Sequence, residues 1–144
     1  MTSFASDAAI ERIALGVIDR TLPKTDWTHA AHFAAAVWLL RYRRDLTTAP
    51  AIKGLISAYN EATNTPNTDT GGYHHTITLA SMPAASAHLA GYPETASLHC
   101  VLDALMASPL RRPEWLLDYW SRETLFSVAA RRDWTPPDLA PLPF

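Results

Sequence analysis

Cysteine is nearly absent from this sequence, and its scarcity excludes several small-domain architectures. Cys100 is the single cysteine, so no disulfide can form within the chain and zinc modules with four cysteine ligands are excluded. Because Cys100 stands in an apolar stretch, we expect a buried structural thiol rather than a nucleophile. A chain without a disulfide framework fits a reducing cytosol best, and the predicted location is cytoplasmic.

Strong charge of one sign and long hydrophobic runs are also missing. The formal net charge is -2 and the sequence pI is about 6.3, so the surface as a whole gives no attraction to nucleic acid, which we do not expect as a partner. The first seven residues lack the basic start and apolar centre of an export signal. The longest apolar run, residues 30–40, includes His32 and falls short of the roughly 20 residues that a bilayer requires. We therefore expect no membrane partner.

The apolar content that remains is enough for one core. Of 144 residues, 48% are hydrophobic and 18% are charged, which excludes a disordered chain and favours one domain over residues 1–144. Apolar residues recur at helical spacing nearly throughout, so the sequence predicts an all-α, single-domain bundle of five to seven helices. We expect helices over residues 7–20, from 26 or 28 to 43, from 48 or 50 to 63, and over 84–90, 94–107 and 114–130, the last as one long or two short helices. Residues 64–72 should form a polar loop. For residues 73–81 the alternatives are helical or extended, and we favour a helix that is kinked or broken near Met82.

The C-terminal segment, residues 134–144, differs from the rest because proline dominates it. Four prolines alternate there with Leu139, Leu142 and Phe144, which predicts an extended chain with apolar side chains available for packing. We expect this tail to dock on the body of the protein or on a second subunit, which leaves a homodimer open.

Two histidines are the first candidate site. His29 and His32 follow Trp27-Thr28 and lie three residues apart on a predicted helix, so both rings can point to one place. His29 falls in the middle of the apolar stripe and should point inward. A buried imidazole needs a hydrogen-bond partner or a metal ion. The alternative to a metal ligand is a core histidine bonded to a carbonyl or hydroxyl.

A second cluster, Gly71-Gly72-Tyr73-His74-His75-Thr76, follows the polar loop. The paired glycines allow a close backbone approach just before imidazole, phenol and hydroxyl groups. Together with His29 and His32, His74 would complete a three-histidine set for one divalent ion such as zinc, nickel or iron. In the alternative interpretation, His74 or His75 caps the next helix, and Asn64 or Asn67 bonds the backbone.

Further residues are candidates for contact with a substrate. The candidate catalytic residues are Tyr73, Asp118 and Glu123. The candidate substrate-binding residues are Trp27, Tyr59, Asn64, Asn67, Tyr73, His75 and Thr76. We interpret His99 and Asp103, one helical turn apart, as an exposed pair, and assign no role to His88.

The combined motifs resemble a family of small bacterial proteins of unknown function, some of which are found on mobile gene cassettes. The resemblance is carried by Trp27-Thr28-His29-x-x-His32 and Gly71-Gly72-Tyr73-His74-x-Thr76, and it spans most of the chain. It implies no established reaction. In that family an acidic residue most often follows the motif histidine, whereas this chain has His75. A weaker, architectural similarity links the chain to DinB-like bundles that hold a divalent metal with three histidines.

Two functions of different classes follow from these observations. The first is a metal-dependent hydrolase or small-group transferase, in which His29, His32 and His74 hold an ion whose bound water attacks a small polar substrate. The second is a non-enzymatic helical module that binds a small molecule with the same histidines and hydroxyls.

Overall fold

The protein folds into helices arranged around one central helix. The computed structural model describes residues 4–144. Within that range it has no strand, and its α-helices are α1 (Asp7–Ile18), α2 (His29–Tyr42), α3 (Ala49–Ala62), α4 (His75–Ala90), α5 (Leu98–Met106), α6 (Arg122–Leu125) and α7 (Val128–Arg132). The predicted all-α bundle of five to seven helices is therefore confirmed. None of the helices in this part of the chain combines the length and apolarity needed to cross a bilayer.

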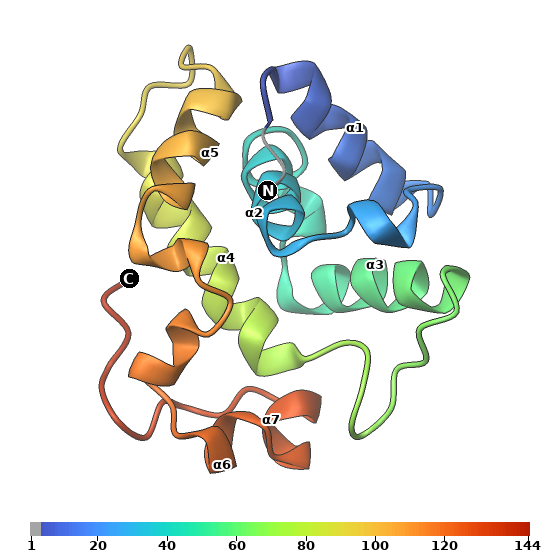
Figure 1. The fold of residues 1–144 in the computed structure, drawn as a ribbon, viewed down its shortest axis with the longest axis vertical. Coiled ribbons are helices and arrows are strands. Elements are labelled where there is room, and N and C mark those ends of the chain that lie inside the picture. Colours follow the sequence, from blue (N-terminus) through green and yellow to red (C-terminus); the bar gives the residue numbers. More distant parts are fainter. Residues whose placement is uncertain (1–3) are drawn as a thin grey trace.

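Helix α2 occupies the centre because it is apolar on every side. Ala31 and all of residues 33–40 are buried, so no face of this helix is suited to solvent. Figure 1 looks nearly along α2, with α1 and α3 on one side and α4 and α5 on the other. Helices α1, α4 and α5 pack directly against it. The apolar run over residues 30–40 therefore lies at the centre of the fold.

Hydroxyl side chains begin three of the long helices. Ser6, Thr28 and Thr48 each accept a hydrogen bond from the backbone N–H three residues further on, at 3.2 to 3.3 Å. Each bond satisfies one of the N–H groups that a helix leaves unpaired at its start. These caps fix where α1, α2 and α3 begin.

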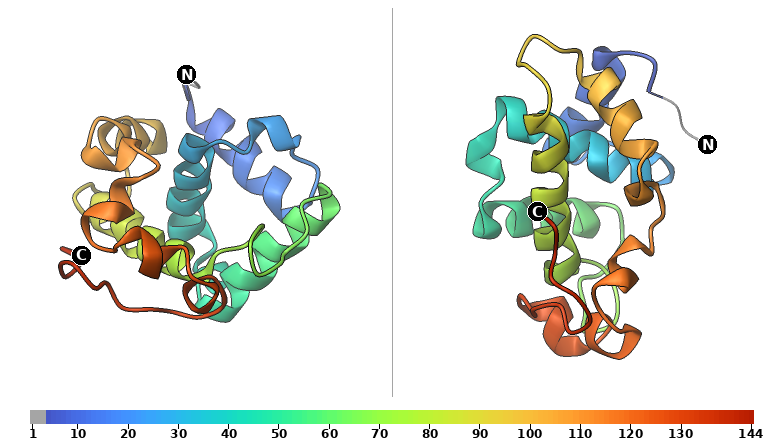
Figure 2. Two further views of the ribbon diagram at one scale, coloured as in Figure 1. Left: turned by 60° about the horizontal axis from the view of Figure 1, so that its bottom comes forward. Right: turned by 90° about the vertical axis from the view of Figure 1, so that its left-hand side faces the viewer.

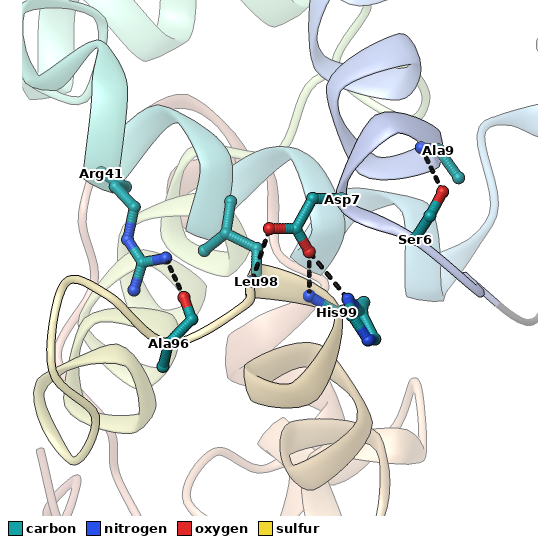
Figure 3. Close-up of polar contacts among 7 residues, drawn as sticks. All are labelled: Ser6, Asp7, Ala9, Arg41, Ala96, Leu98 and His99. Atoms are coloured by element: carbon teal, nitrogen blue, oxygen red, sulfur yellow. Dashed lines mark hydrogen bonds and ion pairs between the residues drawn. The ribbon is translucent and has the colours of Figure 1, made fainter.

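Helix α5 is capped from a distance by Asp7, the first residue of α1 (Figure 3). The Asp7 carboxylate accepts hydrogen bonds from the backbone N–H groups of Leu98 and His99, at 3.1 and 2.9 Å, and lies 2.8 Å from Nδ1 of His99. The expected partner of His99 was Asp103, and this interpretation was wrong. A carboxylate at a helix N-terminus also interacts favourably with the helix dipole, and this long-range contact joins α1 to α5.

Several expected boundaries need correction. The helix expected from residue 94 begins at Leu98. The segment 114–130 starts with a 3-10 turn (Trp115–Asp118) that was not expected, and α6 and α7 then match the alternative of two short helices. Ser121 and Ser127 each cap one of those short helices, which divides the segment. Helix α4 continues through Pro83 without a break. Its neighbours Ala80, Ala84 and Ala85 are fully buried, and this packing holds the helix together across the missing N–H.

Cys100 is exposed rather than buried. The buried residues of α5 are Leu98, Val101, Leu102 and Leu105, and at 100° per residue Cys100 lies on the opposite side of the helix from Leu98. The apolar neighbours of Cys100 in the sequence therefore face away from it.

The proline-rich tail docks on its own chain (Figure 2). Asp138 accepts hydrogen bonds from the backbone N–H and hydroxyl of Ser121, at 2.8 and 2.7 Å, and from the hydroxyl of Thr124 at 2.9 Å. The aromatic ring of Phe144 lies 6.0 Å from that of Trp115. Residues 134–144 thus cover the short helices without forming regular structure.

Candidate functional site

A pocket of about 320 Å³ lies between α2, α3 and α4. Helix α3 packs on α1, which leaves a space between its apolar face and the two other helices. The 3-10 turn Trp115–Asp118 closes one end of this space. Most of the wall is aliphatic or aromatic, including Val17, Phe33, Leu39, Ile52, Ile56 and Met82.

The pocket wall carries no aspartate, glutamate, lysine or arginine among the described residues. Its polar side chains are His29, His32, Thr78, Ser81 and the indoles of Trp27 and Trp115. The hydroxyls of Thr78 and Ser81 donate to helix carbonyls one turn back, at 2.9 and 2.7 Å. The site is therefore mainly apolar, with a few fixed polar groups.

The ring of His32, in the first turn of α2, is held in one orientation. Its Nδ1 lies 2.6 Å from the carbonyl oxygen of Thr28, and its ring stacks on Trp27 with 3.8 Å between centroids. A carbonyl can only accept, so Nδ1 carries the proton and Nε2 keeps a lone pair. No residue of the described chain donates to that Nε2.

Burial lowers the pKa of His32 to about 4, against the smaller opposing effect of its bond to Thr28. By surface area the side chain is exposed, and it is one of the residues that line the pocket. The dense shell of protein atoms around the ring, rather than this local access, decides its charge. His32 is therefore a neutral imidazole at pH 7.

His29 also lines the pocket, and its hydrogen bond connects α2 to the 3-10 turn Pro109–Arg111. Its Nε2 lies 2.8 Å from the carbonyl oxygen of Leu110, which assigns the proton to Nε2 and leaves Nδ1 as an acceptor. This contact matches the alternative of a core histidine bonded to a carbonyl. The prediction that His29 and His32 share one face is confirmed, because both line the same pocket.

His74 has a structural task elsewhere. Its Nδ1 accepts the backbone N–H of Ile77 at 3.2 Å and so caps α4, while its Nε2 donates to the carbonyl of Leu125 at 2.7 Å. Burial lowers the pKa of His74, which keeps the ring neutral. With both nitrogens occupied, this side chain has no lone pair for a metal ion. The alternative interpretation, in which His74 caps the next helix, is confirmed.

The three-histidine set is not assembled. Residues 4–144 contain no group of three or more histidine, cysteine, aspartate or glutamate side chains that is placed to hold a metal ion. His29 and His32 share the pocket, but His74 is not among the residues that line it. The divalent ion stays a sequence prediction without support from this geometry.

The polar loop before α4 is also structural. The side-chain oxygen of Asn67 accepts the backbone N–H of Tyr73 at 2.9 Å, and its amide donates to the carbonyl of Ser57 at 3.0 Å. Gly72 has a φ of 76°, a conformation that favours glycine. The hydroxyl of Tyr73 and Nδ1 of His75 form a hydrogen bond of 2.7 Å. Burial raises the pKa of Tyr73 to about 12. This segment therefore shapes the entrance to α4.

Among the candidate substrate-binding residues, Trp27 alone lines the pocket. Tyr59 is fully buried beside it, with its hydroxyl donating to the carbonyl of Leu22 at 2.9 Å. The pocket does not include Asn64, Asn67, Tyr73, His75 or Thr76, and Asp118 and Glu123 are exposed outside it.

Trp115 is a pocket residue that the sequence did not indicate. It is 3% exposed, and its indole nitrogen has no hydrogen-bond partner within the described chain. A buried donor without a partner lowers stability by about 1 to 3 kcal/mol. No local pattern places this residue near α2, because its position depends on how the chain returns after α5.

Comparison of the chain with family models, with curated proteins and with solved structures finds no match. The function must therefore be argued from the pocket.

Proposed function

We propose that the protein binds one small, uncharged and mainly apolar molecule in the pocket between α2, α3 and α4. The observation that carries this proposal is a volume of about 320 Å³ with mainly apolar walls, in which the lining residues of the described chain include no Asp, Glu, Lys or Arg. Small-molecule pockets span about 300 to 1,000 Å³ and combine apolar walls with a few polar groups. An apolar cavity of roughly 150 Å³ binds benzene, so this pocket suits a molecule with two fused rings.

The lining argues against a charged ligand. An ion that leaves water must find an opposite charge or several hydrogen bonds, and the desolvation penalty otherwise reaches several kcal/mol. Lys24, whose charge acts on His32, is directed to the side chain of Asn60, at 3.4 Å. The pocket wall formed by residues 4–144 contains no lysine or arginine that would neutralise a carboxylate or a phosphate.

The lining also favours binding over catalysis. The described residues that line the pocket include no carboxylate and no serine activated by a neighbouring base. The hydroxyl of Ser81 donates its proton to the carbonyl of Ile77. With a pKa of about 4, His32 is a weak base at neutral pH. Of the two functions that follow from the sequence, the lining of the pocket thus supports the non-enzymatic binding module rather than the metal-dependent enzyme.

Isothermal titration with benzothiophene and benzothiophene-2-carboxylate tests the proposal, because the two probes share one ring system and differ in charge. We expect benzothiophene to bind with one site per chain and the carboxylate to show no binding. Equal binding of both, or no binding of benzothiophene up to its solubility limit, would contradict the proposal.

A further inference from the structure

Backbone carbonyls fix the tautomers of both pocket histidines. The carbonyl of Thr28 takes the Nδ1 proton of His32, and that of Leu110 takes the Nε2 proton of His29. Each ring therefore keeps one nitrogen with a lone pair and no proton. The free atoms, Nε2 of His32 and Nδ1 of His29, are both acceptors.

The two pocket hydroxyls have the same bias. The hydroxyl of Thr78 donates to the carbonyl of His74, and that of Ser81 donates to the carbonyl of Ile77. A hydroxyl that donates elsewhere offers a ligand only its lone pairs. Four polar side chains of the pocket wall are thus acceptors, and the indole N–H groups of Trp27 and Trp115 are the side-chain donors left among the described lining residues.

One of these two donors is out of reach of a ligand. The indole nitrogen of Trp115 is buried away from solvent, so a ligand in the pocket as it stands does not reach it. His32, in contrast, is exposed to the pocket. Its ring is held by the 2.6 Å bond to Thr28 and by stacking on Trp27, so little rotamer freedom is lost when a ligand binds.

We infer that the pocket selects an uncharged ligand that carries an N–H or O–H group and donates it to Nε2 of His32. This inference rests on the proposed function and adds the polar chemistry of the ligand to its size and charge. An N–H heteroaromatic or a phenol has the required group, whereas a ligand with only a ring nitrogen acceptor would set its lone pair against that of His32.

Three fused-ring probes of similar size separate these properties. Indole has an N–H donor, benzothiophene has sulfur in the same ring position, and quinoline has an acceptor nitrogen. We expect indole to bind the wild-type protein about tenfold more tightly than benzothiophene, which corresponds to one neutral hydrogen bond. We expect quinoline to bind no more tightly than benzothiophene.

His32→Phe is the matched variant, because phenylalanine keeps an aromatic ring against Trp27 and removes the acceptor. In this variant the tenfold preference for indole over benzothiophene should disappear, because both probes then meet the same apolar ring. In the wild-type protein, the ¹⁵N resonance of His32 Nε2 should move upfield with indole and stay in place with benzothiophene. That measurement tests the contact without any substitution.

Each outcome has a distinct meaning. Equal affinity for indole and benzothiophene, or a preference for quinoline, would overturn this inference and leave the proposed function intact. Failure of all three probes to bind would contradict the proposed function, and the inference would fall with it.

Discussion

Filling the pocket from helix α2 should stabilise the protein. Ala36 is 6% exposed and lines the pocket, so in Ala36→Leu the three added carbons enter space that no side chain occupies. Each buried methylene contributes about 0.8 kcal/mol, and ordering the leucine side chain opposes this by about 0.5 to 1 kcal/mol. We expect a net gain of about 1 to 2 kcal/mol in the free energy of unfolding, together with loss of benzothiophene binding.

Ala34→Leu is the matched control on the same helix. Ala34 is fully buried but does not line the pocket, and two residues along a helix it lies on nearly the opposite side. The same three carbons therefore enter filled space, and overpacking should destabilise the protein by about 1 to 3 kcal/mol.

Equilibrium urea unfolding, analysed with a common slope, measures both variants. Opposite signs are the expected result. If Ala36→Leu destabilises the protein as much as Ala34→Leu does, the space beside α2 is not available, and the reasoning from the pocket is refuted.

Three further predictions concern the scaffold. Gly72→Ala should destabilise the protein by about 1 to 2 kcal/mol, because a Cβ atom at this φ of 76° would lie 2.6 Å from the carbonyl oxygen of Pro66. Gly54→Ala, in open space on α3, should stabilise the protein by about 0.5 to 1 kcal/mol. Changes of the same sign in urea unfolding would contradict this pair of predictions. Asp7→Ala should remove about 0.5 to 1 kcal/mol at neutral pH through the lost cap of α5. Burial of Asp7 raises its pKa, but hydrogen bonds from His99 and Leu98 outweigh this effect and lower the pKa below 3.8. The contribution of Asp7 to stability is therefore complete above pH 3.8 and disappears as the pH falls through the folded-state pKa. If the wild-type protein is still more stable than Asp7→Ala at pH 2, this prediction is refuted. His29→Ala should lower stability by about 1 to 3 kcal/mol, equally with and without EDTA, because it leaves a buried carbonyl unpaired; a loss seen only without the chelator would instead support a bound ion.

Local features of this fold follow directly from the sequence. Helix α2 is apolar on every side, so its central position needs no knowledge of its neighbours. Ser6 and Thr28 begin their helices through contacts only three residues long. His29 and His32 share a face for the same reason, since the spacing of an α-helix alone brings them together.

Features that depend on distant segments could not be predicted. Asp7 is the first residue of α1, but its carboxylate binds the backbone of α5, which is 91 and 92 positions away in the sequence. Trp115 enters the pocket because of the turns after α5, and no periodic pattern marks that return. His74 has the residue type of a metal ligand, and only the carbonyl of Leu125, which is 51 positions away, reveals that its second nitrogen is engaged.

The ligand pocket is tested most directly by a crystal structure of the protein soaked with bromobenzene. Bromine scatters anomalously, so the difference map locates the ring without any assumption about its orientation. We predict one strong peak between α2, α3 and α4, beside Trp27 and Leu39, and no such peak in crystals of Ala36→Leu. Bromine bound only at the outer surface, or a pocket closed by its own side chains, would contradict the account.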